Sequence, residues 1–168
     1  MPTAVFTLIT TISAVLGTLA GAWIASRAQH QAARITADTT RAADLRRDQL
    51  AAITALAEAI SNHRRTLWQR GTLWHQDRAN PDQADPGRLD QLRDQVYATR
   101  AAITAPLTAL RVLIDDPAVR AAADHMITVT YAIRDATTAT AVDTARADAV
   151  TAHDAFVEAA AHHLKETR

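Results

Sequence analysis

The chain has no cysteine, only four glycines and only two phenylalanines among its 168 residues. Without cysteine it forms no disulfide bond and offers no thiolate nucleophile or thiolate metal ligand, which agrees with a reducing compartment. Nowhere do β-branched residues alternate with polar residues over the length of a strand. Together with the scarcity of glycine, this absence predicts an all-α fold.

The chain also lacks a net charge, because 18 Lys and Arg balance 18 Asp and Glu. Composition therefore gives no overall attraction to nucleic acid or to an acidic ligand. The charges are distributed unevenly: residues 27–78 hold nine Arg against five Asp and Glu, and residues 79–168 hold nine Lys and Arg against thirteen Asp and Glu. Because Arg outnumbers Lys seventeen to one in a chain rich in Ala and Thr, its abundance reflects a GC-rich genome more than a function.

Catalytic signatures are missing as well, since the sequence has neither a glycine-rich phosphate loop nor a G-x-S-x-G motif. A di-iron site in a helical bundle needs inward Glu residues and Glu-x-x-His pairs, and none of the three glutamates begins such a pair. The sequence therefore predicts no enzymatic activity, no cofactor and no metal site. The histidines that invite a metal hypothesis are dispersed along the chain, at His30, His63, His75, His125, His153, His162 and His163.

One long uncharged run stands out, residues 4–25, which read AVFTLITTISAVLGTLAGAWIA. As an α-helix, a run of this length covers about 33 Å, enough to cross a hydrocarbon core of about 30 Å, so we expect a transmembrane anchor. Trp23 lies near one end, where an amphipathic ring suits the membrane interface. Arginines follow the run at positions 27, 34, 41, 46 and 47. Because positive charge stays on the cytoplasmic side, we expect a single-pass protein of the cell membrane with its N-terminus outside and its body in the cytoplasm.

Two other interpretations of residues 4–25 stay open. A secretory signal peptide would be cleaved at Ala20-Gly21-Ala22, but residues 1–3 supply no Lys or Arg and the apolar run is longer than usual. A buried core helix is the other alternative, because Thr and Ser lower the hydrophobicity of the run. Neither residue type excludes a membrane span, since their hydroxyls bond back to the helix backbone.

The predicted anchor has a face of small residues that recur at every fourth position. Small side chains at this spacing let two helix backbones approach closely, and Gly17-Thr18-Leu19-Ala20-Gly21 is a literal G-x-x-x-G motif. We therefore predict self-association of the anchor, against the alternative that an Ala- and Gly-rich composition falls into this register by chance. The residues of this face are Ser13, Gly17, Gly21 and Ala25.

After the anchor, residues 26–47 are polar and rich in Ala, with Ile35 and Leu45 as the only large apolar residues. They predict a solvated helical stalk. A basic helix lying on the membrane surface is the alternative, but the segment lacks the aromatic and Leu face that such helices use. Residues 48–168 then predict a cytoplasmic bundle of antiparallel helices.

Four apolar stripes with alternating three- and four-residue spacing predict that this body is a four-helix bundle. Its later helices are expected at about 87–114, 117–136 and 141–166, with a kink at Pro106. Asp116 and Pro117 read as an N-cap and first helical position. Ala at many stripe positions implies a thin core, which favours dimerisation of the bundle. The first helix ends before the loop at 80–87, and its stripe runs through Leu50, Ile53, Leu56, Ile60, Leu67 and Trp74.

One segment of the first bundle helix, residues 63–74 (HRRTLWQRGTLW), interleaves arginine with tryptophan. Such a pattern can bind phosphates of nucleic acid or lipid headgroups and stack on bases. The alternative, which the sequence favours, is a helix end with Leu67 and Trp74 packed inward and the arginines solvated or stacked on Trp68. The candidate phosphate or nucleic-acid contacts are Arg64, Arg65, Trp68 and Arg70.

Several long segments resemble the KilB-type plasmid-spread proteins of mycelial actinobacteria. These segments are AVLGTLAGAWIA, RRDQLAAITALAEAISNHRRTLWQRG, ATRAAITAPLTALRVLIDDPAVRAAADHM and AVTAHDAFVEAAAHHL, and the resemblance extends over almost the whole chain. The resemblance implies a role in conjugative plasmid transfer and in plasmid spread within the recipient mycelium. It brings no catalytic residues with it.

The resemblance and the predicted anchor together imply a non-enzymatic, membrane-anchored accessory protein of plasmid spread. Its expected partners are membrane lipid, further copies of itself, and a DNA translocase or other spread proteins. Two alternatives stay open: a general membrane scaffold or sensory bundle without a plasmid role, and a membrane protein that contacts DNA directly.

Overall fold

The computed structural model describes the backbone of residues 3–166 and the side chains of residues 39–166. Every regular element in this part of the chain is a helix, which confirms the predicted all-α class. The α-helices and the two 3₁₀ helices are α1 (Thr3–Ala79), η1 (Pro81–Gln83), α2 (Pro86–Ala101), α3 (Thr104–Leu113), α4 (Pro117–Ala132), η2 (Ile133–Asp135) and α5 (Ala139–Glu166).

The chain divides into two compact units, with the boundary between Asp44 and Leu45. The first unit contains the beginning of α1, and the predicted anchor at 4–25 lies in it, outside the residues whose side chains are described. The small-residue face of Ser13, Gly17, Gly21 and Ala25 lies outside them for the same reason. Among the described residues, no helix combines the length and the apolar character that crossing a membrane requires.

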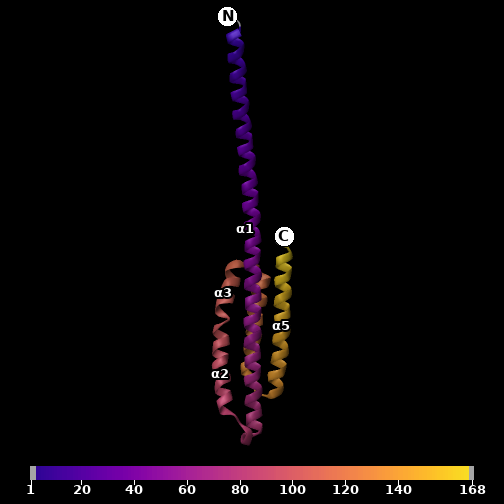
Figure 1. Ribbon diagram of the computed structural model, residues 1–168. Helices are drawn as coiled ribbons and strands as arrows, with labels where there is room; N and C mark the ends of the chain where they lie inside the picture. The colour runs from indigo at the N-terminus through magenta and orange to yellow at the C-terminus, as the bar shows by residue number, and fades with distance from the viewer. Residues whose placement is uncertain (1–2, 167–168) are drawn as a thin grey trace. The chain divides into compact units, whose positions relative to one another are not determined.

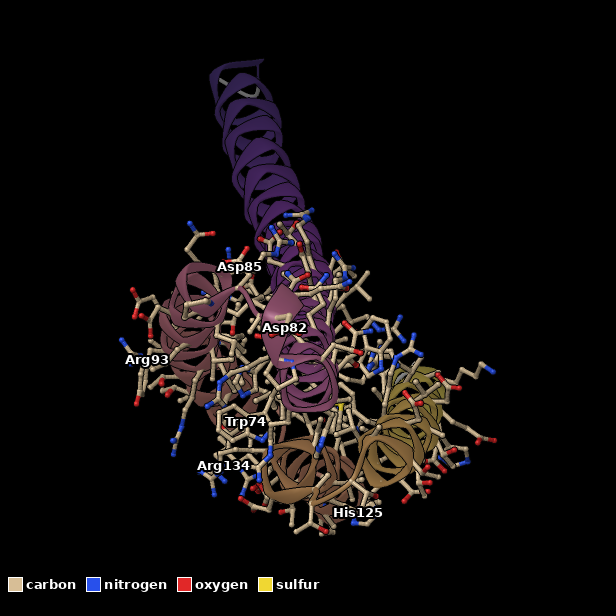
Figure 2. All side chains as sticks on the ribbon, turned by 90° about the horizontal axis from the view of Figure 1, so that it is seen from below. Trp74, Asp82, Asp85, Arg93, His125 and Arg134 are labelled. Carbon is tan, nitrogen blue, oxygen red and sulfur yellow. The ribbon has the colours of Figure 1, made fainter. Side chains whose placement is uncertain are left out.

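The second unit, which begins at Leu45, is a helical bundle. Its four rods are α1 from residue 45 onward, α2 together with α3, α4, and α5, and Figure 1 shows α2, α3 and α5 alongside α1. Successive rods are joined by short connections at 80–85, 114–116 and 133–138, so neighbours run antiparallel. The view along the bundle in Figure 2 places the rods around a shared core. The predicted helical bundle is therefore observed.

Two aspartates cap the starts of helices, and the cap at Asp116 is the one that the sequence predicts. The carboxylate of Asp116 accepts hydrogen bonds from the backbone N–H of Ala118 (2.8 Å) and Val119 (3.3 Å), and Pro117 is the first residue of α4. These bonds satisfy donors that have no partner inside the helix. The N–H of Ala118 is the main cause that lowers the pKa of Asp116. Asp85 likewise accepts from the backbone N–H of Arg88 at 2.9 Å to begin α2.

The kink predicted at Pro106 lies three to four residues earlier, at Ala102 and Ile103. Both residues keep right-handed helical dihedral angles, but the N–H of Ile103 bonds to the carbonyl of Arg100, three residues back, at 3.2 Å. The ring of a proline collides with the carbonyl four residues before it, which here belongs to Ala102. Pro106 itself is the third residue of α3, where a missing N–H costs nothing because donors in the first turn have no intrahelical partner.

The core follows the predicted stripes with two exceptions on α1. Leu50 is 54% exposed and Trp74 is 47% exposed, so the expected burial of both residues is wrong. Near Leu50 the buried position is taken by Gln49, whose amide donates to the backbone carbonyl of Leu113 at 2.9 Å and so satisfies the end of α3. Each of the four rods contributes to the largest fully buried apolar side chains, although α2 itself contributes none. These side chains are Leu56, Ile60, Leu110, Ile114, Val119, Met126, Ile133, Val142 and Phe156.

Small residues let the rods approach closely. A Cβ atom on Gly71 of α1 would lie only 3.1 Å from a methyl group of Val142 on α5, which is tighter than an ordinary contact. Ala123, Ala149 and Ala160 are also fully buried. The core is therefore thin, as the Ala-rich stripes predict, and most of its volume rests on a few large side chains.

Candidate functional site

The four residues predicted to contact phosphates divide between different faces of α1. Trp68 turns toward α5, where its indole N–H donates to Asp143 Oδ1 at 2.9 Å and the guanidinium of Arg146 lies 4.7 Å from its ring centroid. Arg64 also faces α5 and donates to the backbone carbonyl of Ala149 at 3.4 Å. These contacts hold α1 and α5 together, as in the packed-helix interpretation.

Positive charge nevertheless gathers beside Trp68. Burial, followed by repulsion from Arg146, lowers the pKa of Arg64, while Asp154 acts in the opposite direction. Arg65 is exposed on the adjoining face of α1. Arg70 lies elsewhere and lines a hollow with Trp74, so the predicted contacts do not form one site.

On the opposite side of the bundle, α1, α2 and α4 enclose a polar contact around His63. The ring is 1% exposed, and its Nδ1 atom lies 2.9 Å from Thr99 Oγ1. The Thr99 hydroxyl also lies 2.8 Å from the carbonyl of Gln95, and the direction of its bond to His63 depends on the imidazole tautomer. Burial, followed by repulsion from Arg100, lowers the pKa of His63 to about 4. His63 is therefore neutral at physiological pH.

Tyr131 of α4 lies between the buried His63 ring and Arg100. Its ring meets the ring of His63 edge-on, with centroids 5.5 Å apart and an interplanar angle of 86°. The guanidinium of Arg100 lies over the Tyr131 ring, 5.2 Å from its centroid. Arg100 thus belongs to a stack that leads from solvent to a buried imidazole.

Three adjoining hollows, which together we name the arginine groove, open along this side. The first has a volume of about 20 Å³ and lies between Arg100 and Arg134. The second, of about 170 Å³, shares Leu67 and Arg134 with the first, and Figure 2 shows Trp74 and Arg134 at this end of the bundle. The third, of about 530 Å³, shares Arg100 and Tyr131 with the first. The cationic and aromatic residues that line the groove are His63, Arg70, Trp74, His75, Tyr97, Arg100, Arg111, Tyr131 and Arg134.

No Asp or Glu is among the residues that line these three hollows. Arg111 and Arg134 are neutralised from outside the groove, by Asp124 at 2.8 Å and Asp135 at 2.9 Å. Among the described side chains, no carboxylate lies within ion-pair distance of Arg100. The groove therefore carries an uncompensated positive charge close to its centre.

Sequence reasoning missed this groove because its arginines come from separate helices. Arg100 is on α2, Arg111 on α3, and Arg134 in η2, and each is one of seventeen arginines in the chain. No local motif marks them. Within the part of the chain that the structure describes, no group of three or more His, Asp or Glu is placed to hold a metal ion.

Comparisons with known proteins relate the chain to plasmid transfer. A family model described as KilB plasmid transfer protein matches residues 50–164, which is nearly the whole bundle. Protein KilB of Streptomyces lividans is 41% identical over 158 residues, covering 94% of this chain and 99% of the relative. That coverage leaves ten residues of this chain unmatched. No solved structure matches the chain.

Proposed function

Because the chain belongs to the KilB plasmid transfer protein family, we propose that it is a non-enzymatic, membrane-anchored accessory protein of plasmid transfer and intramycelial spread. The family match over residues 50–164 carries this proposal. The helical bundle acts in it as a module for docking other transfer proteins, and the segment before the bundle holds it at the membrane.

The anchor is supported by the uncharged run at 4–25 and by the extent of the similarity. With ten residues of the chain unmatched, the similarity to the Streptomyces lividans protein extends through at least residues 11–25 of the run. Arg27 and the four arginines that follow it favour a cytoplasmic position for the body. In this arrangement the basic start of the body lies beside anionic lipid headgroups.

Self-association completes the proposal. Copies held by anchors in one membrane meet at a high effective concentration, so a weak helix contact is enough to pair them. The G-x-x-x-G face supplies such a contact in the anchor.

A double substitution in the anchor tests the self-association. Gly17→Leu with Gly21→Leu is expected to keep the protein in the membrane fraction and to reduce its crosslinked dimer several-fold, because two Leu side chains separate the backbones. The measurement is chemical crosslinking of the full-length protein in mycelium, followed by fractionation. Thr18→Leu with Ala22→Leu is the matched control, since it adds similar bulk on a face rotated by about 100°. An unchanged dimer yield in the glycine variant contradicts the self-association.

Mass spectrometry of the same crosslinked material tests the docking role. We expect the membrane fraction to contain adducts with proteins of the transfer apparatus, above all a DNA translocase. Recovery of self-adducts alone, or of adducts with unrelated membrane proteins, supports a general scaffold instead. Release of the protein by alkaline extraction contradicts the transmembrane anchor.

A further inference from the structure

The arginine groove has the shape of a docking site for a helix. Its largest hollow lies between the α2–α3 rod and α4, and Leu107 and Ile127 contribute apolar surface to it. Along α2 and α3 it extends from Tyr97 to Arg111, which corresponds to about 21 Å, or four turns of a helix. Grooves between two helices with an apolar floor are a recurrent binding site for amphipathic helices.

The charges of the groove define the occupant. Arg100 has no carboxylate partner among the described residues, whereas Arg134, which lines the same small hollow, is paired with Asp135. Guanidinium groups bind carboxylates in paired hydrogen bonds. Tyr97, which is 64% exposed on the rim, offers an apolar ring with a polar tip. A partner that fits therefore carries apolar side chains on one stripe and carboxylates beside them.

Two observations favour a protein helix over nucleic acid. The body of the chain from residue 45 to 168 holds 15 Lys and Arg against 16 Asp and Glu, so no broad positive field accompanies the groove. In addition, the ring of Tyr131 is covered by Arg100 and touched by His63, which limits its use as a platform for stacking bases.

We propose that the arginine groove binds an acidic amphipathic helix of a protein partner, with a carboxylate of that helix on Arg100 and its apolar stripe over Leu107 and Ile127. This proposal rests on the docking role proposed above and gives that role a surface and a partner chemistry. The neighbouring hollow around Trp74 and His75 receives the next acidic side chain along the helix.

A binding experiment with defined probes tests the proposal. The full-length protein in detergent micelles is titrated against a fluorescent helical peptide of about 18 residues, long enough to cover four turns, with a Leu stripe flanked by Glu. Two further probes are the same peptide with every Glu changed to Gln and an oligodeoxythymidine of similar length. Fluorescence anisotropy gives the three dissociation constants.

We expect the acidic peptide to bind, and Arg100→Gln to weaken it about tenfold, the loss typical of one charge-assisted contact. Arg93→Gln is the matched control, because Arg93 lies on the same helix, pairs with Asp90 at 3.2 Å and does not line the groove. Tyr97→Ala is a second variant, which tests the groove even if Arg100→Gln disturbs packing on Tyr131. It is expected to lower the affinity for the acidic peptide several-fold.

Three results overturn the inference: equal binding of the acidic and neutral peptides, equal losses for Arg100→Gln and Arg93→Gln, or preferential binding of the oligonucleotide through Arg100. If a second copy of the chain occupies the groove, the peptide binds only at protein concentrations low enough to dissociate the dimer. That result also contradicts the proposal. If plasmid spread requires the protein but not Arg100, the docking role stands and the groove is not its site.

Discussion

Phe156→Ala is expected to lower the free energy of unfolding of the bundle by about 3–5 kcal/mol, the usual cost of removing a buried phenylalanine ring. The Phe156 side chain is completely buried on α5 and belongs to the main core cluster with Leu56, Leu110 and Met126. The buried positions around it include several alanines, which cannot move inward to fill the space. Because a domain of this kind is stable by about 5–15 kcal/mol in total, this one change removes a large share.

The measurement is chemical unfolding of the full-length protein in detergent, followed by far-ultraviolet circular dichroism. Val157→Ala is the matched control, because Val157 is the next residue of α5 and is 43% exposed. Its loss is expected to stay below about 1 kcal/mol, as for most surface substitutions. Similar losses for the two variants would show that α5 does not pack with the face described above.

Acidification is expected to destabilise the bundle through His63. The folded protein holds the pKa of this buried imidazole at about 4, below the ordinary value of 6.5 that applies to the unfolded chain. Between these two values the unfolded chain binds a proton that the folded protein excludes, so stability rises with pH in this window. The stability that the neutral His63 contributes is complete above the pKa of the unfolded chain. It is lost as the pH falls toward the pKa of the folded protein. From about pH 7 to about pH 5 the loss is about 2 kcal/mol.

His63→Gln separates this effect from the titration of other groups. Glutamine keeps a side-chain donor for Thr99 but does not titrate, so the variant is expected to be less stable at neutral pH and to lose about 2 kcal/mol less on acidification. Asp116 contributes in a lower range, because its lowered pKa gives stability that is lost only as the pH falls below its ordinary value of 3.8. The same pH dependence in both proteins contradicts a neutral, buried His63.

Local sequence rules predict the positions of the helices better than they predict the contacts between them. Pro117 and the Asp116 cap predict where α4 begins, because caps and missing donors act within one turn. Pro106 predicts an interruption of the second rod, but the interruption lies three to four residues before the proline. The apolar spacing identifies the core faces of α2–α3, α4 and α5. It fails at Leu50, since hydropathy does not indicate that Gln49 is needed to satisfy the carbonyl of Leu113. It fails at Trp74, whose ring lies near the end of the bundle with Arg78 5.5 Å from its centroid.

Contacts between distant segments escape the sequence for a physical reason. The bond from Trp68 to Asp143 joins residues 75 positions apart, and it packs one of the candidate nucleic-acid contacts between α1 and α5. The groove forms in the same way, because Arg100 and Arg134 share a hollow only when α2 and η2 lie against α1. In a chain with seventeen arginines, neither residue differs in its local sequence from those that stay in solvent.

Plasmid spread in the recipient mycelium tests the central claim most directly. The gene is deleted in a plasmid-bearing strain, and both primary transfer and the extent of spread beyond the first recipient compartments are measured. We predict that the deletion reduces spread, that the full-length chain restores it, and that the Gly17→Leu, Gly21→Leu variant restores it only in part. Unchanged spread in the deletion strain, with the protein detected in the parent, would contradict a role in plasmid transfer.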